Sequence, residues 1–159
     1  MSLAADVVKT LAARQQLLGL AESCTGGLLA GAITSIPGSS SVLYLGHVTY
    51  SNEAKLQHLG IDPVTLNAFG AVSEEVVLEM AQGLLTRNPL LDWGIAITGI
   101  AGPSGGSIEK PVGLVYISVL QEGRVPRVIR NIYPGGRQAV RLQAVNHALE
   151  LLLQQIKGN

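Results

Sequence analysis

Apolar residues along this chain recur with a helical period in some segments and alternate with polar residues in others. Leu3, Val7 and Leu11 occupy every fourth position, which is the spacing of one buried helix face. Val48 and Tyr50 flank a polar residue, as in a half-buried strand. Helices are therefore expected over about residues 3–15, 25–35 and 53–58, from 63, from 74 and over 137–156, and strands over about 17–22, 42–50, 93–98, 112–120 and 125–133.

Polar residues mark where several of these elements begin or turn. Asn52 is expected to cap the helix over 53–58, and Pro63 suits the first turn of the next helix. Glu122 and Gly123 predict the turn of a hairpin. Helices thus alternate with strands before the hairpin, which predicts an α/β fold of three layers, α/β/α, with a mixed sheet. No repeat or linker divides the chain, so residues 1–159 are expected to form a single domain.

Composition narrows the class of protein. The chain has 159 residues, of which 47% are hydrophobic, enough for a sizeable core. Eleven basic residues balance eleven acidic ones, so no basic face for a nucleic acid is indicated. Low charge together with a mean hydropathy of +0.35 favours apolar surface covered by another subunit, and we expect a homo-oligomer.

The number of cysteines and one long uncharged segment indicate in which cellular compartment the protein is expected. Cys24 is the only cysteine, which excludes a disulfide framework and fits a reducing cytoplasm. The first residues lack the basic and apolar parts of a signal peptide. Residues 24–52 contain no Asp, Glu, Lys or Arg, but glycines, serines and Pro37 interrupt them. We therefore expect core and pocket lining there rather than a membrane span.

The segment Ala21–Gly27 is the most informative part of the chain, because it joins a predicted strand to a predicted helix. The first N–H groups of a helix lack intrahelical partners and lie at its positive end, which suits an anion or oxyanion. Ser23 in this turn could be a nucleophile if Lys55 removed its proton. The spacing of these two residues alone favours structural roles instead, with Ser23 bonded to backbone and Lys55 solvated.

A cysteine nucleophile is the competing interpretation of the same turn. The N-terminus of a helix lowers the pKa of a thiol, which would favour a reactive Cys24. A cysteine hydrolase usually needs a histidine base, and His47, His58 and His147 are scattered outside polar motifs. A small buried apolar residue is the interpretation that we prefer for Cys24.

Two further segments could bind a ligand. A glycine-rich loop from Thr98 and Gly99 to Gly106 follows a predicted strand, but it fits no standard phosphate-binding motif. Arg137 and Arg141 lie four residues apart at the start of the last helix, where they could clamp a phosphate or remain solvated. No clustered histidines or carboxylates indicate a metal, and no cofactor is expected.

Taken together, these segments resemble the CinA C-terminal domain family, whose characterised activity is the deamidation of nicotinamide mononucleotide. The chain resembles the stand-alone form of that family. One departure is Leu45-Gly46-His47, where the family often has an apolar residue in the third position. The matching segments, in family order, are Ala21–Gly27, Pro37–Ser40, Val48–Lys55, Gly70–Ser73, Thr98–Pro103, Gly105–Gly106, Lys110–Gly113 and Arg137.

The resemblance implies an amidohydrolase that converts nicotinamide mononucleotide to nicotinic acid mononucleotide and ammonia, without metal or cofactor. It implies that Ser23 is the nucleophile, that Lys55 is the general base and that Tyr50 orients Lys55 or relays the proton. The remaining implied roles are an oxyanion site at Thr25, Gly26 and Gly27, a nucleotide site at Thr98 and Gly99, and a phosphate ligand in Arg137 or Arg141. A catalytically inactive nucleotide-binding or regulatory protein of the same fold is the alternative.

Overall fold

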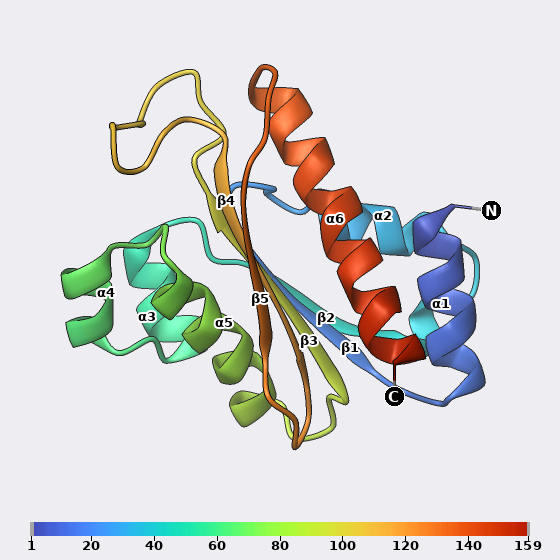
Figure 1. Cartoon of the computed structure of the whole chain (residues 1–159). Helices are drawn as coiled ribbons and strands as arrows, with labels where there is room; N and C mark the ends of the chain where they lie inside the picture. The colour runs from blue at the N-terminus through green and yellow to red at the C-terminus, as the bar shows by residue number, and fades with distance from the viewer. Residues whose placement is uncertain (1, 159) are drawn as a thin grey trace.

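Five strands form one mixed sheet in the order β2-β1-β3-β4-β5, seen nearly edge-on in Figure 1. The structure is a computed structural model and describes residues 2–158, so Met1 and Asn159, the ends of the expected domain, lie outside the described residues. Strand β1 pairs in parallel with β2 and β3, whereas β3, β4 and β5 pair antiparallel. The strands are β1 (Leu18–Glu22), β2 (Leu43–Val48), β3 (Trp93–Gly99), β4 (Leu114–Gln121) and β5 (Arg127–Ile132).

Helices cover both faces of the sheet, which gives the expected three layers (Figure 1). One face carries α1 (Leu3–Ala13), α2 (Leu28–Thr34) and α6 (Arg137–Lys157), and the other carries α3 (Asn52–Leu59), α4 (Pro63–Phe69) and α5 (Glu74–Arg87). The short 3-10 helix η1 (Ser39–Ser41) precedes β2. The α/β fold with a mixed sheet is therefore confirmed.

The core consists of two apolar clusters, one on each face of the sheet. Side chains alternate across a strand, so Ile95 and Ile97 of β3 join the cluster under α1, α2 and α6, while Ala96 joins the one under α5. Gly83 of α5 allows α3 to approach closely, because a Cβ there would lie 1.9 Å from the carbonyl oxygen of Leu59. This contact fixes α3, the helix that carries Lys55.

Several element boundaries differ from the sequence-based expectation, and three of these differences lie near the site. Helix α2 begins at Leu28 rather than near residue 25, because Gly26 and Gly27 have φ angles of 58° and 101° in the left-handed region. Strand β2 ends at Val48 instead of Tyr50. The cap of α3 is Ser51, whose Oγ accepts a hydrogen bond from the N–H of Ala54 at 3.0 Å, so the expected capping role of Asn52 is wrong.

The order of strands explains where a site forms. The chain leaves β1 through α2 on one face to reach β2, and leaves β2 through α3, α4 and α5 on the other face to reach β3. The carboxyl end of β1 therefore lies where successive connections switch faces, which is the usual ligand position in open α/β sheets. Ser23 is the first residue beyond that end. Among the described residues, no helix is long and apolar enough to cross a membrane.

Candidate active site

Ser23 and Lys55 meet at the carboxyl end of β1. The N–H of Ser23 donates to the carbonyl oxygen of Ile97 at 3.1 Å, which ties the residue to the neighbouring strand β3. Lys55 reaches it from α3, with its Nζ 3.0 Å from the Oγ of Ser23. Ser23 is 9% exposed and Lys55 only 1%. The structure thus brings together two residues that are far apart in the sequence, in a place largely shielded from water.

Two backbone carbonyls complete the surroundings of the lysine amine. Lys55 Nζ donates to the carbonyl oxygen of Thr49 at 2.7 Å and to that of Tyr50 at 3.3 Å. A neutral amine has two N–H donors and one lone pair. If the two carbonyls accept the two donors, the lone pair faces Ser23 Oγ. The arrangement therefore suits an amine that accepts the serine proton.

Burial also favours the neutral form of this amine. Loss of hydration lowers the pKa of Lys55 from 10.5 to about 8, and the nearby Cys24 acts weakly in the opposite direction. A general base works best when its pKa is close to the working pH. The buried environment of Lys55 thus gives its amine a pKa close to neutral pH, which an exposed lysine would not have.

The turn that carries Ser23 is held by a buried carboxylate. Glu22, 1% exposed, accepts hydrogen bonds at Oε1 from Thr25 Oγ1 at 2.7 Å and from the N–H of Gly27 at 3.2 Å. The N–H of Gly26 donates to the carbonyl oxygen of Ser23 at 3.0 Å. Both N–H groups already have protein acceptors, so the oxyanion role expected of Gly26 and Gly27 gains no support from their hydrogen bonds and stays a prediction. The N–H of Thr25 has no acceptor among the described residues.

The two arginines of α6 have different partners. Arg141 donates from Nε to the carbonyl oxygen of Cys24 at 3.0 Å and from Nη2 to that of Thr25 at 3.1 Å. Arg137 is exposed and donates to the carbonyl oxygen of Gly102 at 2.8 Å and to Tyr50 Oη at 3.0 Å. Arg141 therefore fastens the serine turn, whereas Arg137 spans two loops on either side of the site.

A hollow of about 270 Å³ opens over Ser23 and Lys55. Its charged lining groups are Lys55 and Arg137, and no carboxylate lines it. Thr25, Gly26, Gly27 and Arg141 do not line it either. The remaining polar side chains of the lining are Ser23, Cys24, Tyr50, Asn52, Thr98 and Ser104.

Sequence reasoning missed Asn52 as a lining residue. Asn52 lies one helical turn before Lys55 on α3, a spacing that could have placed both on one side of that helix. Ser104 belongs to the glycine-rich loop that the sequence singles out as a possible ligand site, and it lines the hollow. A larger hollow of about 430 Å³ lies between α5 and the β4–β5 hairpin, but no serine, cysteine, lysine or histidine of the described residues lines it.

Strand β3 delivers Thr98 and Gly99 to the edge of the hollow. Thr98 Oγ1 donates to the carbonyl oxygen of Ala71 at 2.8 Å, which joins the strand to the segment before α5. A Cβ at Gly99 would lie 2.7 Å from Val115 Cγ2 and 3.1 Å from Cys24 Sγ. The predicted lining role of this strand end agrees with its position, and Gly99 leaves room for the Cys24 side chain.

Cys24 lacks the environment of a reactive thiol. It is 5% exposed, and burial raises its pKa to about 11, so that the thiolate is scarce at neutral pH. His47 and His58 stack on each other with ring centroids 5.8 Å apart, and His147 Nδ1 lies 2.7 Å from Tyr133 Oη. Within residues 2–158, no cluster of three or more His, Cys, Asp or Glu could hold a metal ion.

Known proteins have sequences similar to this one. The sequence profile described as the CinA C-terminal domain matches residues 1–156. A protein of Moorella thermoacetica that carries the name competence-damage inducible protein is 52% identical over 149 residues, covering 93% of this chain and 35% of its own length. A CinA-like protein of Leptospira biflexa is 47% identical over 141 residues, covering 89% of this chain and 34% of its own length. The chain thus spans about a third of the curated relatives that it matches.

Solved structures agree over nearly the whole fold. The competence/damage inducible protein CihA from Agrobacterium tumefaciens has a TM-score of 0.93 at 44% identity, with 96% of this chain and 92% of that chain covered. A CinA superfamily protein from Klebsiella pneumoniae has a TM-score of 0.93 at 38% identity, with 99% and 97% covered. This chain belongs to the CinA C-terminal domain family.

Proposed function

We propose that the protein is an amidohydrolase that converts nicotinamide mononucleotide to nicotinic acid mononucleotide and ammonia. The observation that carries this proposal is the 3.0 Å contact between Ser23 Oγ and the buried Lys55 Nζ. An amide is a weak electrophile, so its hydrolysis needs both an activated nucleophile and a proton for the leaving nitrogen. A serine paired with a partly neutral lysine can supply both.

The reaction proceeds in two stages. Lys55 takes the proton of Ser23 Oγ while this oxygen bonds to the carboxamide carbon of the substrate. The ammonium form of Lys55 then protonates the amide nitrogen, the carbon–nitrogen bond breaks, and ammonia leaves an acyl ester on Ser23. In the second stage, Lys55 takes a proton from water, the hydroxide attacks the ester carbon, and the proton returns to Ser23 Oγ. The product acid releases its proton to the solvent and becomes a carboxylate, and both residues regain their starting forms.

The charge of the hollow supports a substrate that carries an anionic group. Lys55 and Arg137 are its charged lining residues. Arg141 does not line the hollow, whereas the exposed Arg137 does, and this favours Arg137 as the arginine that binds a phosphate. The substrate would then lie with its carboxamide at Ser23 and its phosphate toward Arg137.

An assay of ammonia release from nicotinamide mononucleotide tests the proposal. The wild-type protein should turn the substrate over, and Ser23→Ala should lose at least about a thousandfold in kcat, because no other hydroxyl replaces the nucleophile. Ser41→Ala, which changes an exposed serine of η1, is the matched control and should keep full activity. Full activity in a folded Ser23→Ala variant would refute the mechanism. Calorimetric binding of the mononucleotide without turnover would instead favour the non-catalytic alternative.

A further inference from the structure

Glu22 is a carboxylate that is only 1% exposed, and none of its hydrogen-bond donors among the described residues is an arginine or a lysine. Such a group is costly unless hydrogen bonds compensate for its lost hydration. Four donors do so here. Thr25 Oγ1 and the N–H groups of Gly27 and Leu29 donate to Oε1 at 2.7, 3.2 and 2.9 Å, and the N–H of Ala30 donates to Oε2 at 3.0 Å.

These donors include the N–H groups at the start of α2, which otherwise lack intrahelical acceptors. The carboxylate also offsets the positive end of the helix dipole. Glu22 therefore caps α2 from the end of the preceding strand, across the turn that holds Ser23. The two ends of this turn are connected through one side chain.

Four of the other five α-helices begin differently, whereas α6, which follows Gly136, also lacks a side-chain cap. Each of four helices is capped by the residue directly before it, whose side chain accepts from an N–H two or three positions further on. Helix α2 has no such local cap, because Gly27 precedes it. A local Ser or Asp would suffice if capping were the only requirement. The four local caps are Ser2, Ser51, Asp62 and Ser73.

Arg141 holds the opposite side of the turn. Its guanidinium donates to the carbonyl oxygens of Cys24 and Thr25, while Glu22 accepts from the hydroxyl of Thr25 and the N–H of Gly27. The buried Glu22 thus accepts hydrogen bonds from the donors of the turn, and the half-buried Arg141 donates hydrogen bonds to its carbonyl oxygens. Ser23 lies inside this clamp, next to the strand contact of its own N–H with Ile97.

We propose that Glu22 is a positioning residue for the nucleophile: it fixes the turn so that Ser23 Oγ stays within reach of Lys55 Nζ. This inference rests on the proposed serine–lysine chemistry, but not on a particular substrate. Small misplacements of a catalytic group can lower the rate by about a hundredfold. The effect should therefore fall on kcat, because Glu22 does not line the hollow.

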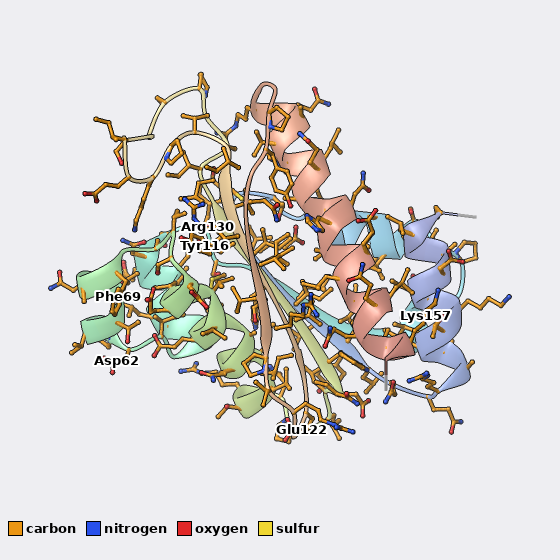
Figure 2. All side chains as sticks on the ribbon, in the orientation of Figure 1. Asp62, Phe69, Tyr116, Glu122, Arg130 and Lys157 are labelled. Carbon is orange, nitrogen blue, oxygen red and sulfur yellow. The ribbon has the colours of Figure 1, made fainter. Side chains whose placement is uncertain are left out.

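The test compares two variants, each of which replaces a carboxylate at the start of a helix with an amide of the same shape. Glu22→Gln keeps one acceptor oxygen but presents an amide to the N–H of Ala30, and it should lower kcat by about ten- to a hundredfold with KM changed less than about threefold. Asp62→Asn changes the cap of α4 (Asp62 is labelled in Figure 2), which does not line the hollow, and should leave kcat within about twofold. Equal kcat values for Glu22→Gln and wild type would overturn the proposal.

A second readout does not depend on the substrate. Covalent labelling of Ser23 by a fluorophosphonate, followed by mass spectrometry, should slow in Glu22→Gln by a similar factor and be absent in Ser23→Ala. If wild type is labelled but releases no ammonia, the proposed substrate fails and the labelling rates still decide the role of Glu22. If wild-type Ser23 is not labelled at all, the nucleophile assignment and the role of Glu22 fail together.

A milder variant covers the case in which Glu22→Gln does not fold. Thr25→Val removes only the 2.7 Å hydrogen bond to Glu22 Oε1 and keeps the shape of the side chain. It should lower kcat in the same direction by about two- to tenfold, with KM unchanged. Arg141, on the other side of the turn, remains in place. Unchanged kcat and labelling rate in folded Thr25→Val would contradict a positioning role.

Discussion

Lys55 Nζ and Ser23 Oγ lie 3.0 Å apart, although they belong to α3 and to the turn after β1. The carbonyl oxygens of Thr49 and Tyr50 hold the same amine from the other side. The geometry leaves a neutral Lys55 one lone pair, directed at the serine. Catalysis should therefore follow the protonation state of one buried lysine.

The pH dependence of the reaction tests this directly. Burial lowers the pKa of Lys55 to about 8, and only the neutral amine can accept a proton. We expect kcat/KM to rise about tenfold per pH unit below pH 8 and to level off above it. Measurements from about pH 6.5 upward avoid the second ionisation of the substrate phosphate, which lies near pH 6. A flat profile between pH 6.5 and 8.5 would contradict a lysine base.

Stability should depend on pH through the same group. The pKa of Lys55 lies below its ordinary value of 10.5 in the folded state, so the unfolded chain binds more protons between about pH 8 and 10.5. The lysine therefore destabilises the fold fully below pH 8, and this effect disappears as the pH rises through that window. The free energy of unfolding should gain up to about 3 kcal/mol across it from this residue.

Comparison with Lys55→Met isolates the contribution. Burial raises the pKa of Cys24 to about 11 and that of Tyr133 to about 12, and both effects make stability fall at alkaline pH. Both proteins are compared in a Cys24→Ala background, because the Lys55 charge itself lowers the pKa of Cys24. The effect of Tyr133 is then common to both, so the difference between their urea unfolding curves should rise with pH. No rise in that difference would show that Lys55 is not desolvated. Activity of Lys55→Met should fall at least about a hundredfold.

The two arginines should separate binding from catalysis. Arg137→Met should raise KM for nicotinamide mononucleotide at least about tenfold, because a charge-assisted contact with the phosphate is lost. Nicotinamide riboside, which lacks the phosphate, should show little change with the same variant. Arg141→Met should instead lower kcat for both compounds, because Arg141 bonds to the carbonyl oxygens of Cys24 and Thr25. Equal losses for both substrates in Arg137→Met would indicate a structural role.

Cys24 should be dispensable. Cys24→Ala should keep at least about a third of the wild-type kcat, since the mechanism uses no thiol. Iodoacetamide should modify the native thiol slowly at pH 8, because Cys24 is 5% exposed and burial raises its pKa to about 11. Rapid alkylation, or an inactive but folded Cys24→Ala variant, would point to a cysteine hydrolase.

Local patterns in the sequence were sufficient to predict most helices and strands of the fold. The helix at Leu3 and the strand at Trp93 follow from apolar periodicity, because each buries one continuous surface. The expectation of Asn52 as the cap of α3 fails by one residue, because Ser51 before it is of a type that caps helices equally well. The start of α2 was placed too early, because the left-handed conformations of its two glycines depend on the contacts of the turn.

The candidate site was predictable only in part. The local sequence predicts the turn at Ser23 between a strand and a helix. The pairing of Ser23 with Lys55 was expected only from the family resemblance. The partners of Arg141 had no such signal, since this residue and Cys24 are 117 positions apart and meet only through the packing of α6. In the sequence, Glu22 is recognisable only as a carboxylate directly before the serine. Its role depends on the direction of α2, which residue spacing does not encode.

The turn of the β4–β5 hairpin lies at the end of the sheet opposite the hollow. Gln121 pairs with Trp93 at the start of β3, whereas Val115 pairs with Gly99 beside the hollow. Glu122, in the exposed turn of this hairpin, lies at the far end of the molecule in Figure 2. A cysteine introduced there, in a chain that also carries Cys24→Ala, would give a single attachment point. The protein could then be immobilised on a solid support with its substrate entrance directed into the solution.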